Sequence, residues 1–340
     1  NAGATSGKAY LYYAKNTAGT LTVGSNSPAH NNGNAVLDIG EKAGVQPTNI
    51  RTLHSRSICV VMIAGSPVVM LNEYNVNGAR VAGSTNDQCY VRRSDDLGKT
   101  WSIFLTFNTN GSTSQVRHGH GVVQDKLTGS IYFLFGDDPT SGILRWNGTA
   151  AAPPANTPLP AFNFYDGWGS LARTDGRTDD YRSGDLIFIG DCGSYLTDRA
   201  NSRTFWKSTT TSRVDIFSAV KGEEVDLSDG RDPLIGLAVP GAGGFWATMW
   251  DNQVTPTVRG FTFFSTPDGK SWERIGELQD VGTTGSTAVL FNMFMSKENL
   301  IVVSLISGSS KLINNTNTYG GSVVFNAEKL FDGVFKNLSA

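Results

Sequence analysis

The 340-residue sequence contains few cysteines, few charged residues and no long apolar run. Its three cysteines leave at least one unpaired within a monomer, so we expect buried free thiols and no disulfide framework. Charged residues make up 17% of the chain and the net charge is −2, which argues against a basic surface for nucleic acid. No apolar run approaches the roughly 20 residues of a membrane helix, so we expect no membrane insertion. We also expect no cofactor.

Glycine is abundant, with 39 residues, and Asn, Ser and Thr are frequent. This composition is typical of an all-β chain with many turns. The chain starts at Asn1 without a Met or a signal-like segment, which indicates a mature form or an excised fragment.

The most specific short pattern is the eight-residue stretch from Ser94 to Trp101. Strand-like residues flank it, Cys89 to Val91 before and Ile103 to Leu105 after, so it predicts the turn of a β-hairpin. In such a turn the carboxylate of Asp96 accepts hydrogen bonds from backbone N–H groups, Gly98 takes positive φ, and the Trp ring packs against the hairpin. The turn itself performs no chemistry.

The same residue types return between Ser265 and Trp272, with the acidic residue one place further along. The pattern S-x-D-x-G-x-(S/T)-W resembles the Asp-box, or BNR repeat, of the sialidase superfamily, where it closes the outer hairpin of propeller blades. The copies start 171 residues apart, from 94 to 265. Three blades would each span about 57 residues, which predicts further hairpins near 151 and 208. At 208 the residues Trp206 to Thr211 could be a decayed copy of the pattern, whereas Ala150 to Pro154 near 151 is a loop.

This resemblance implies an all-β fold, a β-propeller of sialidase-like type with six blades. We expect residues 1–340 to form one propeller domain, with 1–48 completing the last blade and removing an open sheet edge. Short strands are predicted at Ala9 to Tyr13, Thr20 to Val23 and Ala35 to Ile39.

The resemblance to sialidases extends to the segment before the first turn. Those enzymes carry, in order, an Arg, a hydrophobic hairpin, an acidic residue, a loop with an acid/base Asp, and an R-R-S sequence. This chain has Arg56, a hairpin, Glu73, a loop ending in Asp87, and Arg92-Arg93-Ser94. The family's R-I-P signature is R-S-I here, so Arg51 competes with Arg56. Asp87 is read either as the acid/base or as a structural turn residue.

Two histidines, His118 and His120, follow Arg117. Residues at i and i+2 of a strand point to the same face, so the pair could carry protons, contact a glycan together with Arg117, or line a polar channel. No third His or Cys is nearby, so a metal site is not expected. An aromatic-rich loop at 150–183 offers Trp168 for stacking on a sugar, or for packing inward.

Three further residues are implied by the resemblance. Asp232 stands where sialidases carry a Glu before Pro, Arg259 suits a second carboxylate-binding Arg, and Tyr319 is the late candidate for a Tyr nucleophile. The candidate catalytic residues are therefore Asp87, Glu73, Asp232 and Tyr319. The candidate substrate-binding residues are Arg56, Arg117, His118, His120, Arg259 and Trp168.

The function that this resemblance implies is a glycoside hydrolase acting on an acidic glycan, sialic acid-like or uronate-containing. An Asp would serve as acid/base and Arg groups would hold the carboxylate. A His-dependent lyase is the less favoured enzymatic reading. The alternatives are a glycan- or receptor-binding propeller of lectin or phage tail-fibre type and a protein-binding propeller. We expect an extracellular or virion-surface location and leave oligomerisation open.

Overall fold

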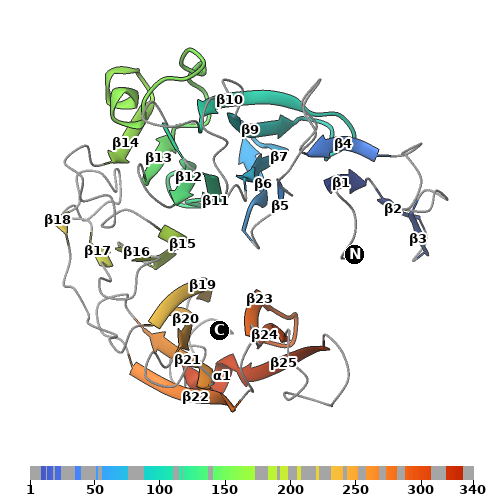
Figure 1. Ribbon diagram of the computed structural model, residues 1–340, viewed down its shortest axis with the longest axis vertical. Helices are drawn as coiled ribbons and strands as arrows, with labels where there is room; N and C mark the ends of the chain where they lie inside the picture. The colour runs from blue at the N-terminus through green and yellow to red at the C-terminus, as the bar shows by residue number, and fades with distance from the viewer. Residues whose placement is uncertain are drawn as a thin grey trace. The chain divides into compact units, whose positions relative to one another are not determined.

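The computed structural model (Figure 1) comprises two compact units, residues 1–176 and 177–340, which we describe separately. The structure describes residues 9–12, 14–17, 20–23, 35–39, 51–52, 56–75, 88–109, 115–116, 118–136, 141–172, 183–189, 192–197, 205–207, 220–221, 231–239, 243–251, 258–267, 273–281, 288–307 and 319–331. None of its described helices is long and apolar enough to span a membrane.

Unit 1 contains two four-stranded antiparallel sheets. The first consists of β6 (Ile58–Ile63), β7 (Ser66–Asn72), β9 (Gln88–Ser94) and β10 (Ser102–Asn108). The second consists of β11 (His118–Gln124), β12 (Ile131–Gly136), β13 (Gly142–Trp146) and β14 (Trp168–Ala172), with the 3-10 helix η2 (Leu159–Phe164) before its last strand. Three two-stranded pairs complete the described strands of the unit: β1 (Ala9–Tyr12) with β4 (Ala35–Ile39), β2 (Ala14–Thr17) with β3 (Thr20–Val23), and β5 (Arg51–Thr52) with β8 (Tyr74–Asn75).

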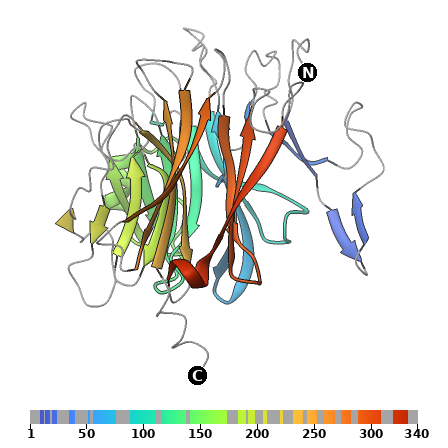
Figure 2. The ribbon, with the colours of Figure 1, turned by 90° about the horizontal axis from the view of Figure 1, so that it is seen from below.

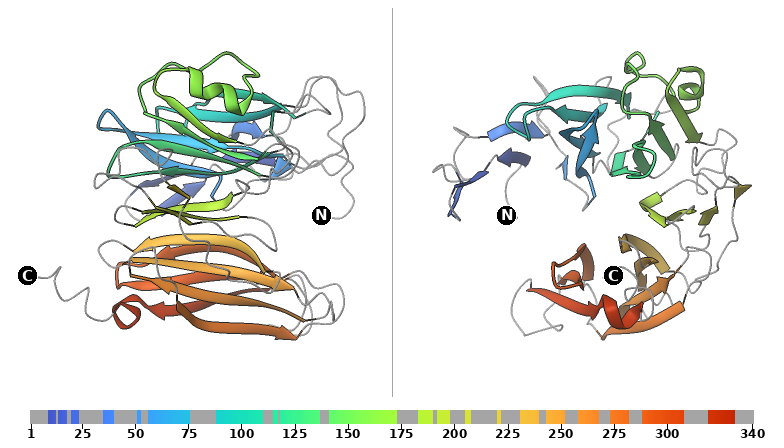
Figure 3. Two further views of the ribbon diagram at one scale, coloured as in Figure 1. Left: turned by 90° about the vertical axis from the view of Figure 1, so that its left-hand side faces the viewer. Right: turned by 180° about the vertical axis from the view of Figure 1, so that it is seen from behind.

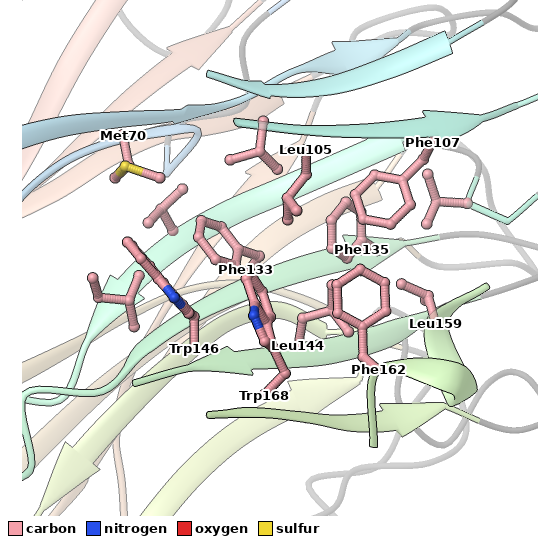
Figure 4. Close-up of a cluster of buried hydrophobic side chains, with 14 of the residues drawn as sticks. Met70, Leu105, Phe107, Phe133, Phe135, Leu144, Trp146, Leu159, Phe162 and Trp168 are labelled. Atoms are coloured by element: carbon pink, nitrogen blue, oxygen red, sulfur yellow. The ribbon is translucent and has the colours of Figure 1, made fainter. Parts of the chain in front are cut away.

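The two sheets of unit 1 enclose a hydrophobic core (Figure 4). Alternate side chains of the first sheet point into it, so that Val61 is fully buried whereas Val60 is exposed. All six residues of β12 are buried, as expected for a strand covered on both faces. The indole rings of Trp146 and Trp168 stack in this core with their centroids 5.9 Å apart.

Unit 2 also contains two four-stranded antiparallel sheets. They consist of β15 (Ser183–Ile189), β16 (Cys192–Thr197), β17 (Phe205–Lys207) and β18 (Val220–Lys221), and of β19 (Arg231–Val239), β20 (Gly243–Asp251), β21 (Val258–Thr266) and β22 (Glu273–Val281). A three-stranded sheet of β23 (Ala288–Met295), β24 (Leu300–Ser307) and β25 (Tyr319–Asn326) leads into the short helix α1 (Ala327–Leu330), as Figure 2 shows. A second core of buried residues, among them Phe245, Phe263 and Ile301, belongs to this unit.

The turn between β9 and β10 has the hydrogen bonds that the sequence predicts. The Asp96 carboxylate accepts hydrogen bonds from the backbone N–H groups of Lys99 and Thr100 at 3.0 and 2.8 Å, and from the Thr100 hydroxyl at 2.7 Å. Gly98 has a φ of 94°. The hydrogen bonds to Thr100 and Ser94, followed by that to Lys99, lower the pKa of Asp96 to about 2.

The chain is an all-β protein built from sheets of the propeller-blade type, but six blades are not what the structure shows. Within its described residues, four sheets have the four strands of a blade and the β23–β25 sheet has three. The two copies of the turn pattern occupy equivalent places: Ser94 ends β9 and Ser265 lies near the end of β21, each the third strand of its sheet.

The spacing of the two turn copies predicts a hairpin near 151, but Ala150 to Pro154 is a loop there, as its composition predicts. The chain runs from β13 to β14 through residues 147–167, which include η2. The sequence predicts a loop without strand period at 150–183, and this prediction is wrong at Trp168–Ala172, which forms β14. The expected hairpin near 208 falls between β17 and β18, outside the described residues.

Candidate functional site

Strand β11 carries both histidines and contains a β-bulge at His120. In the pairing of β11 with β12, Gly119 lies opposite Phe135 and Gly121 lies opposite Leu134, so His120 is the extra residue between them. A bulge turns a side chain out of the regular alternation and is common next to active sites. The bulge therefore sets the direction of the His120 ring.

Two residues outside β11 support this bulge. The Asn72 side-chain amide donates hydrogen bonds to the carbonyl oxygens of Gly121, at 3.2 Å, and Leu134, at 2.9 Å. Gly121 and Leu134 form the first pair after the point at which the pairing slips. Gly136 makes room for the ring, because a Cβ atom at this position would overlap the His120 imidazole. A Cβ at Gly119 would likewise overlap the Asn72 amide.

The two histidine rings lie together and are almost fully buried, with 3% of each residue exposed. Their Nε2 atoms are 3.0 Å apart, which is a hydrogen bond in which one imidazole donates and the other accepts. Their ring centroids are 4.9 Å apart. Because each ring can hold its proton on either nitrogen, such a pair can pass a proton from one ring to the other.

Tyr74, at the start of β8, covers the histidine pair. Its ring centroid is 4.1 Å from that of His118 and 5.9 Å from that of His120. Tyr74 is partly exposed, whereas the two histidines are buried, so solvent reaches this cluster at Tyr74. We call Tyr74, His118 and His120 the histidine–tyrosine cluster.

Glu73 is fully buried and forms an ion pair with Arg92. The Arg92 Nε atom lies 2.6 Å from Glu73 Oε1, and the guanidinium stacks 5.0 Å above the ring of Tyr90. The Glu73 backbone oxygen accepts a hydrogen bond from the Gly119 N–H at 2.8 Å. Glu73 therefore links the first sheet to β11 and orients Arg92, and it offers no carboxylate to solvent.

Arg56 lies beside β11 and contacts it through its backbone. Its backbone forms an isolated parallel bridge with Gly121, and its carbonyl oxygen accepts from the Val122 N–H at 3.0 Å. Gln124, at the end of β11, also joins the two sheets through both atoms of its amide: Met62 N–H donates to it at 2.8 Å and it donates to Met62 O at 2.7 Å. The strand that carries the histidines is thus fixed at both ends.

For five other candidate residues the structure describes no side-chain contact with this cluster. Arg117 and Asp87 lie outside the described residues. Asp232, Arg259 and Tyr319 lie on strands β19, β21 and β25 of unit 2, where their side chains are not described.

Trp168 is buried in the core of unit 1, with its Nε1 donating to the Ala151 carbonyl at 2.8 Å. The sequence leaves two interpretations open for Trp168, stacking on a sugar or packing inward, and the structure shows that it packs inward. Its ring contacts core side chains where a sugar would otherwise stack.

Asn72, Tyr74 and Gly136 are the residues of this site that the sequence reasoning missed. A signal for Asn72 was present, because a buried polar residue at the end of an apolar strand needs hydrogen-bond partners. Gly136 ends a run of large apolar residues in β12, where a glycine indicates close approach of another group. Within the part of the chain that the structure describes, no group of three metal-ligating side chains is present.

No family model matches the sequence, and no curated protein matches it either. Solved structures with a distant likeness include an ulvan lyase of the polysaccharide lyase family PL25, with a TM-score of 0.44, 10% identity, and coverage of 81% of this chain and 72% of that one. An alpha-L-arabinanase of Penicillium chrysogenum has a TM-score of 0.37, 12% identity and coverage of 82% and 66%. An endo-arabinase from Bacteroides thetaiotaomicron has a TM-score of 0.36, 10% identity and coverage of 81% and 95%. These likenesses are too distant to assign the chain to a family.

Proposed function

We propose that this chain cleaves an acidic polysaccharide and that the histidine–tyrosine cluster is its proton-transfer site. The observation that carries the proposal is the 3.0 Å contact between the two histidine Nε2 atoms beneath the partly exposed Tyr74 ring. The substrate class comes from the resemblance of the Arg56 to Ser94 segment to sialidases.

The reaction that best suits this cluster is β-elimination at a uronate. A base removes the proton from the carbon next to the carboxylate, and the freed electron pair forms a carbon–carbon double bond as the glycosidic C–O bond breaks. The departing oxygen takes up a proton. Tyr74 is placed to meet the sugar, and the histidine pair can accept a proton and return it. An Arg such as Arg56 would bind the carboxylate.

Most glycoside hydrolases use two carboxyl groups on either side of the scissile bond, whereas sialidases combine an acid/base carboxyl with a Tyr nucleophile. Glu73, the described carboxylate beside the cluster, is buried and paired with Arg92. A hydrolase would therefore depend on Asp87 as acid/base. One observation favours that second candidate: the Glu73 N–H donates to the Tyr90 carbonyl of β9 at 3.0 Å, and β9 begins at Gln88, the residue after Asp87 in the sequence.

The test measures two products at once from alginate, polygalacturonate, hyaluronan and colominic acid. An eliminase produces reducing ends together with the ultraviolet absorbance of the conjugated double bond, whereas a hydrolase produces reducing ends alone. We expect both signals from the wild-type chain and a loss of at least about a hundredfold in His120→Ala, in line with the usual contribution of a general acid–base group. Lys126→Ala, an exposed change in the turn after β11, is the matched control.

Reducing ends without new absorbance, lost in Asp87→Asn and retained in His120→Ala, would replace elimination by the hydrolase. Binding without any product would leave a lectin or tail-fibre protein. A polysaccharide substrate of this kind would be met outside the cell or at a virion surface, which is the location we propose.

A further inference from the structure

The connection from β13 to β14 turns two aromatic rings toward solvent. Phe164, at the end of η2, has 89% of its surface exposed, and Tyr165 has 37% exposed. Figure 3 shows η2 as the green coil beside β14. Burial of a Phe side chain usually stabilises a fold, and at Phe164 this fold leaves the ring in solvent.

The exposure of Phe164 follows from the geometry of the helix. Residues three apart lie on the same face of a 3-10 helix, so Leu159 and Phe162 both point into the core, where each is 1% exposed. Phe162 packs edge-on against Trp168 with the ring centroids 5.2 Å apart (Figure 4). Phe164 lies off this face and points outward.

The backbone on both sides of Phe164 is held in place. The Asn163 side chain accepts from the Ser170 N–H at 2.7 Å and donates to the Ser170 carbonyl at 3.1 Å. The Tyr165 N–H donates to the Phe162 carbonyl at 3.1 Å. A ligand that stacks on Phe164 therefore pays little to order the segment, because the ring is already presented on a fixed turn.

The size and surroundings of this surface fit a sugar better than a protein. A stable protein interface buries about 800 Å² on each partner around several apolar residues, whereas here one ring and half of another stand beside the exposed polar residues Asn163 and Asp166. One face of a pyranose ring is apolar and can stack on an aromatic ring, while its hydroxyls need polar neighbours.

We propose that Phe164 and Tyr165 form an auxiliary binding platform for the polysaccharide chain, separate from the histidine–tyrosine cluster. The choice of ligand rests on the proposed function. The strand order β11-β12-β13-β14 puts the histidines on one edge strand of the sheet and β14, against which η2 packs, on the other. Three strand intervals of about 4.8 Å separate β11 from β14 by about 14 Å, so one sugar residue cannot occupy both sites. The platform holds a distant part of the same chain.

The direct test is affinity electrophoresis of the full chain in gels that contain alginate, polygalacturonate, hyaluronan or colominic acid. We expect Phe164→Ala to weaken binding of the retarding polymer between about three- and tenfold, and Tyr165→Ala to weaken it less. Phe164→Trp should retain binding. Leu127→Ala, which removes a 70% exposed apolar side chain from the turn between β11 and β12, is the matched control and should bind as the wild type does.

The cleavage assay provides an independent readout. With polymer as substrate, Phe164→Ala should raise KM by the same factor, and the effect should shrink as the substrate is shortened, because a short oligosaccharide cannot reach the platform from the cluster.

Each other result of the gel test overturns the platform. Equal retardation of wild type and Phe164→Ala would refute it and leave the proposed reaction intact. No retardation of the wild type by any of the four polymers would also refute it, and product formation then decides the reaction separately. A change of oligomeric state in Phe164→Ala by light scattering, with unchanged retardation, would assign the two rings to self-association.

Discussion

At the scale of single residues, the His120 ring can take its position only because Gly136 has no side chain. The imidazole of His120 occupies the volume that a Cβ at position 136 would fill. Gly136 also pairs with His118 across the two strands, so one position touches both members of the pair. A methyl group there would displace the ring on which the proposed proton transfer depends.

Gly136→Ala should therefore reduce activity and stability together. Overpacking of this kind typically costs about 1 to 3 kcal/mol of unfolding free energy, and a displaced catalytic group can lower the rate by about a hundredfold. Urea denaturation and the cleavage assay measure the two effects. Gly276→Ala is the control, because a Cβ there would meet only Phe263, at 3.9 Å.

A double-variant cycle separates the clash with His120 from other causes. Removal of the ring in His120→Ala frees the space, so Gly136→Ala should cost much less stability in that background than in the wild type. An equal cost in both backgrounds would mean that the Ala side chain disturbs the β11–β12 pairing without involving the His120 ring.

The sequence predicts that His118 and His120 lie together, but it does not predict the bulge that orients their rings. The period of a strand puts residues 118 and 120 on one face. The slip of pairing at His120, however, depends on the Asn72 amide and the absent side chain at Gly136, which come from other strands. Contacts between strands distant in sequence are what a single sequence does not reveal, and the same reason explains why Tyr74 was missed.

At the scale of elements, the β9–β10 turn is the part of the fold that local sequence determines most completely. All of the bonds to the Asp96 carboxylate come from within Ser94 to Thr100. Strand β14 is the opposite case. Trp168 to Ala172 pairs with β13 across a 21-residue connection. The aromatic residues before it predict a loop, because the sequence has no tight turn next to this strand.

The lowered pKa of Asp96 predicts a pH dependence of stability. Its pKa falls from 3.8 to about 2 in the folded chain, so the unfolded chain binds the proton more tightly. The stabilisation is complete above the unfolded pKa and is lost as the pH falls through about 4 toward about 2. Asp96→Asn has no such group to titrate.

Urea denaturation of the wild type and Asp96→Asn between about pH 2 and about pH 6 tests this prediction. The difference in unfolding free energy between the two chains should be largest at the upper end and should shrink on acidification. A difference that stays constant with pH would show that the turn bonds are equally strong with a neutral side chain.

At the scale of the whole molecule, each unit has its own hydrophobic core. The buried residues of the core in unit 1 come from residues 61–168, and those of the core in unit 2 come from residues 239–331. Ile131 and Ile301 are fully buried in the first and the second core respectively. The two positions share no packing partner among the residues that make up these cores.

This separation predicts additive effects on stability. Ile131→Val and Ile301→Val each remove one buried methylene group and should each cost about 0.5 to 1.5 kcal/mol of unfolding free energy. The double variant should cost the sum to within about 0.5 kcal/mol, as is usual for sites without common contacts. Urea denaturation, followed by tryptophan fluorescence, measures the wild type, the two single variants and the double variant. The control is the pair Ile131→Val and Leu144→Ala, both within the first core, for which we expect a departure from additivity. A coupling above about 1 kcal/mol between Ile131 and Ile301 would mean that the two cores respond to substitution as one.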